Sequence, residues 1–419
     1  MPVYDAPADP IPTRSTPAGE PHVRTLAPDD DCRLARLAEV QLMDTRCLPQ
    51  PLLVGVSLPG GVCAGHDPDV RYSTPDAFAR IKKSRKELYA LLQRLAEQPH
   101  FREGFVWDTC QRVEFYGWVR SPDSPARRAA AAARVARDLF GEPRLGLEVN
   151  QLDGCQVWHH LMRTACGLNS RLPGDLDVTA QLETAVHFAQ SAGAAGGRAA
   201  AMLERVLRVA QDVGRATEWG GFRTGYCRAA LCELRDPQRI AWDRCTHVVI
   251  GGSTTSRSIL NTLVNVYHVP EQRITLVYRG HHGQWKQLRD ALGGGRRLRV
   301  QAYTDPDILE AIAGADVVFF GLDVAGPVLE PAAVNRLRDF QRRPLLLVDF
   351  NSLGSIGASE PARGITLCSA PRLDAAVNSY AETLRRRPDF CRAAQAADRW
   401  IRSRGLARIG RSPAGLATA

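Results

Sequence analysis

Residues 105–119 read FVWDTCQRVEFYGWV, two apolar runs joined by a short polar segment. The flanking runs, 104–108 and 113–119, are rich in aromatic and β-branched residues, and such residues favour strands. The polar segment between them, TCQR, is typical of a turn. The stretch therefore predicts two strands with a cysteine in the turn that joins them.

The sequence on either side of this stretch supplies the other elements of one domain. Residues 52–58 (LLVGVSL) predict a buried strand, and Thr74-Pro75 begins a helix whose apolar residues lie on one face to about residue 95. An alanine-rich segment, 124–140, predicts a second helix, and LGLEV (145–149) predicts a closing strand. The order β-α-β-β-α-β is the ferredoxin-like pattern.

The second half of the chain has a different pattern of predicted helices and strands. Residues 151–240 are helical in character without a strand run, and strands then alternate with helices. The predicted strands are 246–251, 274–279, 315–321 and 344–350. This alternation predicts a parallel sheet with a ligand crevice at the carboxyl ends of its strands.

These segments predict a mixed α/β and α+β protein with several domains. Near the C-terminus, Pro388 predicts a break in the helical stretch. The predicted parts are a flexible extension at 1–50, a domain at 51–240 (ferredoxin-like 51–150, helical 151–240), a Rossmann-like domain at 241–360, and a short C-terminal helical region at 361–419.

The composition is that of a globular protein with a basic surface. Of the 419 residues, 44% are hydrophobic and 24% are charged, and the formal net charge is +9. An excess of positive charge is compatible with an acidic partner such as RNA, although a bias towards arginine gives the same excess. The charge therefore permits a polyanionic partner without requiring one.

The cysteines and the hydropathy pattern indicate in which cellular compartment the protein is expected. Eleven cysteines are scattered without a C-x-x-C pair, so we expect neither a disulfide framework nor a metal site, and we expect a reducing cytoplasm. No stretch is apolar and long enough for a membrane span, and the proline-rich start does not resemble a signal peptide.

Cys110 is the first candidate for chemistry. A thiolate is the reactive form of cysteine, and positive charge nearby stabilises it. Arg112 lies two positions on, so Cys110 could attack an activated carbonyl and hold the acyl group as a thioester. A buried structural cysteine is the alternative, and the stretch alone does not decide between them.

A second candidate, His160, lies in WHHLMRTACGLNSRLPGD (158–175), where the helical pattern ends at GLNSRLPGD. A single histidine in a helix is either a chemical group or an ordinary surface or core residue. Both interpretations stay open for this stretch by itself.

The third candidate is the turn GGSTTS after the strand at 246–251, where a dinucleotide fingerprint G-x-G-x-x-G is expected. Gly251 and Gly252 are present, but Ser253 and Ser256 replace the second and third glycines of the fingerprint. The helix N-terminus still offers N–H groups and hydroxyls to a phosphate. The candidate cofactor residues, NADP being the expected cofactor, are Gly251, Gly252, Ser253, Thr254, Ser256 and Arg279, whose position suits a 2′-phosphate. A nucleotide fold that no longer binds a nucleotide is the alternative.

In this order, the segments resemble glutamyl-tRNA reductase, the family that opens the five-carbon route to tetrapyrroles. The family's Thr-Cys-Asn-Arg is TCQR here, and its His-Leu-Phe-Arg-Val-Ala-x-Gly-Leu-Asp-Ser is HLMRTACGLNS (160–170). The family's Gly-Glu-x-Gln-Ile-x-Gly-Gln is GDLDVTAQ (174–181), and its nucleotide strand and turn are VVIGGSTTS. The resemblance covers about 52–405.

The resemblance implies a mechanism. Cys110 would attack the ester of an aminoacyl-tRNA, glutamyl-tRNA in the first place, and NADPH would reduce the thioester to an α-amino aldehyde. His160 would orient the substrate or assist proton transfer as a second catalytic residue. The residues that match the substrate pocket are Thr109, Arg112, Glu114, Ser170 and Gln181. A homodimer is implied as well, although the C-terminal dimerisation region is short here.

The chain departs from the family mainly at the cofactor turn, which suggests a divergent paralogue in a specialised pathway. Three hypotheses follow: an NADPH-dependent aminoacyl-tRNA reductase, an acyltransferase or thioesterase-like enzyme that uses Cys110 without reduction, and a non-catalytic tRNA-binding relative.

Overall fold

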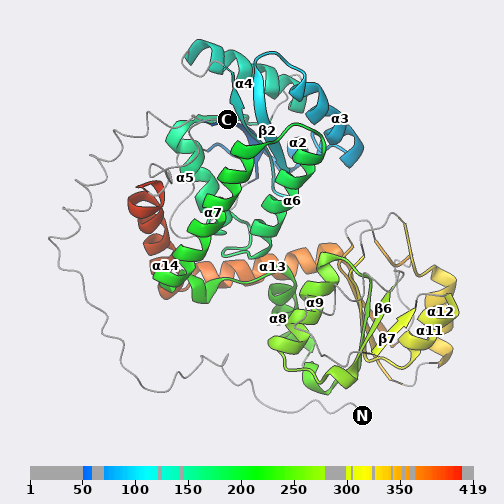
Figure 1. Cartoon of the computed structure of the whole chain (residues 1–419). Helices are drawn as coiled ribbons and strands as arrows, with labels where there is room; N and C mark the ends of the chain where they lie inside the picture. Colours follow the sequence, from blue (N-terminus) through cyan, green and yellow to red (C-terminus); the bar gives the residue numbers. More distant parts are fainter. Residues whose placement is uncertain are drawn as a thin grey trace. The chain divides into compact units, whose positions relative to one another are not determined.

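The computed structural model describes a chain with two compact units (Figure 1). Among the described residues, we call them the cysteine unit (within 51–224 and 381–407) and the nucleotide-fold unit (within 225–380). The described residues are 51–58, 70–120, 125–141, 146–238, 240–278, 299–302, 305–322, 326–340, 343–351, 354–357 and 364–407. The predicted extension at 1–50 lies outside them.

The cysteine unit contains a four-stranded antiparallel sheet. Its strands are β1 (Leu52–Ser57), β2 (Phe101–Asp108), β3 (Arg112–Val119) and β4 (Asn150–Asp153), in the order β2-β3-β1-β4. The helices α2 (Pro75–Ala79), α3 (Arg85–Ala96) and α4 (Pro125–Phe140) complete the β-α-β-β-α-β order. The ferredoxin-like pattern predicted for this segment is therefore present.

Two details of this sheet differ from the sequence prediction. The closing strand is not LGLEV but the next segment, NQLD, where alternate residues are buried. The helix predicted from residue 74 to 95 is divided, because Ser84 begins α3 with a capping box that it forms with Glu87.

The hairpin of β2 and β3 is held by aromatic packing. The rings of Phe105 and Tyr116 stack with their centroids 5.2 Å apart, and both side chains are fully buried. A Cβ atom at Gly117 would lie 2.4 Å from the Phe115 ring, so glycine makes room for that ring. The strands that flank Cys110 are therefore rigidly packed.

Helices α5 (Gly154–Ala165), α6 (Asp177–Ser191), α7 (Gly197–Ala216) and α14 (Pro388–Trp400) complete the cysteine unit, with the short turns η2 (Glu218–Phe222) and η5 (Ile401–Gly405). Helix α6 packs against β2. Pro388 begins α14 after α13 (Ala370–Arg385) has ended, so the predicted helix break is confirmed. The rings of Trp219 and Phe222 lie 5.2 Å and 5.3 Å from Phe390, which joins α14 to this unit.

The nucleotide-fold unit contains a six-stranded parallel sheet in the order β10-β9-β8-β5-β6-β7. Its strands are β5 (His247–Ile250), β6 (Ile274–Tyr278), β7 (Arg299–Ala302), β8 (Val317–Phe320), β9 (Leu345–Asp349) and β10 (Ile365–Cys368). Its helices are α8 (Tyr226–Gln238), α9 (Thr254–Asn265), α11 (Asp305–Ala313) and α12 (Pro331–Phe340). The short turns η3 (Trp242–Arg244) and η4 (Glu271–Arg273) belong to the same unit. This is the doubly wound order, and its direction reverses between β5 and β8. A crevice at such a point is the usual ligand position.

The division between the units differs from the predicted domain boundaries. Helix α8 packs against α9 and the Tyr226 hydroxyl donates to Asp374, which places α8 with the nucleotide-fold unit. The segment 381–407 packs with the cysteine unit instead of forming a region of its own. In the part of the chain that the structure describes, no helix combines the length and apolar character that a bilayer crossing needs.

Candidate functional site

Cys110 is exposed and lies at a polar hollow in the cysteine unit. The hollow is open to solvent. Its walls come from the turn between β2 and β3, from the loop after α5 and from the first half of α6. They are Thr109, Cys110, Gln111, Arg112, Ser170, Asp175, Val178 and Gln181. The predicted residues Thr109, Cys110, Arg112, Ser170 and Gln181 are thus brought together.

The turn that carries Cys110 is fixed on both sides. The Thr109 amide donates to the Arg112 carbonyl at 2.9 Å, and the Gln111 amide donates to the Thr109 hydroxyl at 3.2 Å. Lys82 donates to the Thr109 carbonyl at 2.7 Å. The Gln111 side chain accepts the Arg171 amide at 2.7 Å and so ties the turn to the opposite loop.

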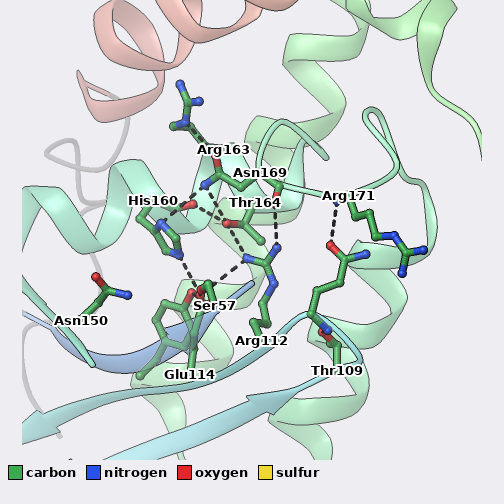
Figure 2. A network of polar contacts seen from close by, with 12 residues as sticks. Ser57, Thr109, Arg112, Glu114, Asn150, His160, Arg163, Thr164, Asn169 and Arg171 are labelled. Atoms are coloured by element: carbon green, nitrogen blue, oxygen red, sulfur yellow. Dashed lines mark hydrogen bonds and ion pairs between the residues drawn. The ribbon is translucent and has the colours of Figure 1, made fainter. Parts of the chain in front are cut away.

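The Arg112 guanidinium is 4% exposed and held from several sides (Figure 2). It donates to the Thr164 hydroxyl at 3.1 Å and to the Asn169 carbonyl at 3.2 Å. The Arg112 Cζ atom lies 5.3 Å from the centroid of the Trp107 ring, which is a cation–π contact. The orientation of this cation is therefore set before any ligand arrives.

Glu114 is the buried counter-ion of Arg112, with 3.7 Å between Oε1 and Nη1. Hydroxyl groups of Ser57 and Tyr116 donate to its two oxygens, each at 2.7 Å. Burial would raise the pKa of Glu114, but the Arg112 charge and His160 lower it to about 2. A Cβ at Gly55 would lie 2.6 Å from the Glu114 Cγ, so β1 leaves space for this carboxylate.

His160 lies in the same buried network and not in the hollow. It is 3% exposed, and its Nε2 lies 3.1 Å from Glu114 Oε1. In Figure 2, His160 and Glu114 lie on the opposite side of Arg112 from Thr109. His160 and Glu114 are not among the residues that line the hollow; both are buried and in contact with each other beside Arg112, and their roles toward a substrate stay predictions.

Ser170 and Gln181 lie at the other wall of the hollow. Ser170 is 2% exposed, and within the described residues its hydroxyl has no hydrogen-bond partner. Gln181 is exposed on α6. An unsatisfied buried hydroxyl is unfavourable by itself, so Ser170 is suited to a ligand.

The loop after α5 contains a lining residue that the sequence analysis did not select, Asp175. Its Oδ1 accepts the Asp177 amide at 3.0 Å. Burial and the Asp177 charge raise the pKa of Asp175 to about 7. A carboxyl between a glycine and a helix start was the available signal, but a helix cap has the same pattern.

The cofactor turn belongs to the nucleotide-fold unit and follows β5. Gly251 adopts a φ of 119°, which a side chain would disfavour. The Ser253 hydroxyl donates to the Gly321 carbonyl after β8 at 2.5 Å and accepts the Ser256 amide at 3.3 Å. The Ser256 hydroxyl also donates to Gly321, at 2.9 Å, and is fully buried.

These contacts do not fit the dinucleotide site that the glycine fingerprint provides. In that fingerprint a glycine lets the pyrophosphate approach, and free helix N–H groups receive it. Here Ser253 caps the helix, and two hydroxyls join β5 to β8 at the reversal point of the sheet. Gly252 and Thr254 stay exposed, and Arg279 lies outside the described residues. We derive no hydride step through this turn.

Known proteins resemble the part of the chain that holds this site. A family model described as the N-terminal domain of glutamyl-tRNA(Glu) reductase matches residues 72–217, which include every residue that lines the hollow. Glutamyl-tRNA reductase 2 of Anaeromyxobacter sp. is 28% identical over 278 residues, 64% of this chain and 60% of that protein. Glutamyl-tRNA reductase of Micrococcus luteus is 28% identical over 253 residues, 58% of this chain and 54% of that protein.

Among solved structures, glutamyl-tRNA reductase from Methanopyrus kandleri aligns with a TM-score of 0.39 and 16% identity, over 84% of this chain and 80% of that one. The alignments with the curated relatives span between half and two thirds of the length of those proteins. Residues 72–217 thus match the N-terminal domain of the glutamyl-tRNA reductase family, and the chain is similar to these relatives over about three fifths of its length.

Proposed function

We propose that this protein takes the acyl group of an aminoacyl-tRNA onto Cys110 as a thioester, with glutamyl-tRNA as the first substrate to test. The observation that carries the proposal is the exposed Cys110 at the edge of a polar hollow that also holds the Arg112 cation. The relatives, which are named glutamyl-tRNA reductases, support the choice of substrate.

The proposed step is an exchange of one ester for another. The Cys110 thiolate attacks the carbonyl carbon that joins the amino acid to the terminal ribose of the tRNA. A carbon–sulfur bond forms, the carbon–oxygen bond to the ribose breaks, and the ribose oxygen takes up a proton. The Arg112 cation lines the same hollow and stabilises negative charge on the sulfur.

Arg112 also provides the group that selects the amino acid. Two of its donors are used by Thr164 and the Asn169 carbonyl, and Arg112 is one of the residues that line the hollow. A guanidinium that is already oriented binds a carboxylate in two-point fashion. This favours an acidic side chain on the substrate, and His160 and Glu114 serve as positioning residues for that contact.

The tRNA is proposed as the partner on the same grounds. The formal net charge of +9 permits contact with a polyanion. This contact is expected to weaken as the salt concentration rises, because counterions that are released on binding become less favourable to release.

The fate of the thioester divides two candidate functions. The family implies reduction with NADPH to an α-amino aldehyde, glutamate-1-semialdehyde from a glutamyl group, and the doubly wound sheet supports this outcome. Transfer or hydrolysis of the acyl group without reduction is the second candidate. The serine-closed turn at Ser253 and Ser256 favours the second. A pathway other than tetrapyrrole supply fits either outcome.

The experiment is a labelling assay over a panel of tRNAs charged with radioactive amino acids. We expect label on the protein with glutamyl-tRNA, and we expect Cys110→Ser to abolish it. Cys155→Ser is the matched control, because Cys155 is an exposed cysteine of the same unit outside the hollow. No label with any charged tRNA would refute acyl capture and leave tRNA binding alone.

A second measurement separates the two fates. Purified protein is titrated with NADPH, and the cofactor fluorescence is followed. Absence of binding at about millimolar NADPH, the upper limit of ordinary KM values, would refute the reductase and leave acyl transfer. Binding together with a labelled aldehyde among the products would refute the second candidate.

A further inference from the structure

Asp175 adds an acidic group to the lining of the hollow, which also holds the Arg112 cation. We propose that Asp175 binds the α-ammonium group of the acyl group that Cys110 holds, so that the hollow selects acyl groups with a free amino group. This inference rests on the proposed function. It adds a specificity residue that recognises the amino end of the substrate.

The loop geometry fixes the position of Asp175. Gly167 and Gly174 have φ values of 76° and 78°, and the Gly174 amide donates to the Gly167 carbonyl at 3.0 Å. A Cβ at Gly167 would lie 2.6 Å from the Asp175 amide nitrogen, so the loop folds tightly onto itself. The carboxyl of Asp175 is therefore held at the wall of the hollow by a rigid backbone.

The carboxyl keeps acceptor capacity for a ligand. The bond from the Asp177 amide uses Oδ1, and a carboxylate has two oxygens with about four acceptor positions. The Ser170 hydroxyl lines the same hollow, is 2% exposed and lacks a partner within the described residues. Two polar groups from one loop thus remain available at the same wall.

The charges in the hollow match a substrate that carries one charge of each sign. An α-ammonium and a side-chain carboxylate, as in a glutamyl group, would pair with Asp175 and Arg112 respectively. The charged groups that act on Asp175 are Asp177 at the start of α6, Arg112 from β3 and Arg223 after η2. The pKa of Asp175 lies at about 7, and an ammonium beside it would favour the ionised form.

The structural role of Asp175, which accepts the Asp177 amide, can be separated from recognition of a ligand. Asp175→Asn keeps an oxygen that accepts the Asp177 amide and removes only the charge. Glu183→Gln is the matched control, because it removes an exposed carboxylate from α6 that does not line the hollow. Retention of the helical circular-dichroism signal shows that Asp175→Asn is folded.

The test uses two small reagents that alkylate Cys110, the cation 2-bromoethylamine and the neutral iodoacetamide. Because no tRNA is involved, the result does not depend on the proposed function. The rate ratio of the cation to the neutral reagent is expected to fall about fivefold in Asp175→Asn, in the range of a partly exposed ion pair, and to stay unchanged in Glu183→Gln. An equal ratio in wild type and Asp175→Asn would overturn the proposal.

The same variants are then compared with glutamyl-tRNA and N-acetyl-glutamyl-tRNA. We expect wild type to react faster with the free amino form, and we expect Asp175→Asn to lose this preference by slowing that substrate alone. If the reagent ratio changes but neither tRNA labels wild type, acyl capture from tRNA has failed while ammonium recognition stands. If both tRNAs label wild type equally, ammonium recognition has failed while acyl capture stands.

Discussion

The carboxylate of Glu114 offers the sharpest test of how the site is supported, through the substitution Glu114→Gln. Glutamine has nearly the same shape, so packing against Gly55 is preserved, but the charge that compensates Arg112 is lost. The Arg112 guanidinium would then be a buried cation without its counter-ion. We expect Glu114→Gln to destabilise the cysteine unit and to loosen the orientation of Arg112.

The magnitude follows from the pKa of Glu114. A fall from the ordinary value of 4.5 to about 2 corresponds to about 3 kcal/mol in the free energy of unfolding. Because the folded pKa is the lower one, this contribution is complete above pH 4.5 and is lost as the pH falls through about 2. The glutamine variant has no such group. The gap in unfolding free energy between the two proteins should therefore narrow by about 2 kcal/mol from about pH 6 to about pH 3.

The assay is urea unfolding followed by tryptophan fluorescence, for wild type and Glu114→Gln at both pH values. Glu204→Gln serves as the matched control, because its carboxylate is 69% exposed and pairs with Arg208 at the surface. Its effect should be within about 0.5 kcal/mol and should depend little on pH. A gap between wild type and Glu114→Gln that is small, or that stays constant with pH, would refute the ionised, stabilising carboxylate.

Further predictions concern the two ends of the site and the cofactor turn. Arg112→Lys keeps the charge but loses the fork geometry, and labelling by glutamyl-tRNA should fall at least about tenfold while alkylation of Cys110 by iodoacetamide changes little; equal loss in both assays would contradict a role in selecting the carboxylate. Gly55→Ala places a Cβ 2.6 Å from the Glu114 Cγ, so we expect a loss of about 1–3 kcal/mol in urea unfolding; wild-type stability would contradict this close contact. Ser253→Gly restores the second glycine of the fingerprint, and NADPH fluorescence titration should show tighter binding than in wild type; unchanged binding would mean that Ser253 does not close the turn. The alkylation ratio of 2-bromoethylamine to iodoacetamide should rise as the pH passes about 7, where Asp175 ionises, and should stay flat in Asp175→Asn; the same slope in both proteins would assign the titration to another group.

Periodicity predicted the strands that are apolar along their whole length. The runs that became β3, β5, β8 and β9 are buried at nearly every position, and such runs leave few alternatives. Strands β7 (RVQA) and β10 (ITLC) were missed, because four residues with polar members give a weak signal. Strand β4 was misplaced for a related reason, since the apolar run beside it is exposed at Val149.

The candidate site was predictable as a set of residues but not as a geometry. Residue types and spacing identified Cys110 and Arg112, since thiolate chemistry needs a cation nearby. The burial of Glu114 could not be predicted from the sequence, because it depends on Gly55 and Ser57 of β1, nearly sixty positions away in the chain. Asp175 was missed because the fold, and not the sequence spacing, brings it into the wall of the hollow.

The proposed acyl site and the cofactor turn depend on different parts of the chain, so one can change without the other. All residues that line the hollow lie between 109 and 181, within the cysteine unit, and their supporting network closes on itself through Arg112 and Glu114. The contacts of Ser253 and Ser256 lie wholly within the nucleotide-fold unit. A turn closed by serines is therefore compatible with an intact acyl site. Thioester formation should be the same in wild type and Ser253→Gly, so that only the fate of the acyl group changes when a glycine reopens the turn.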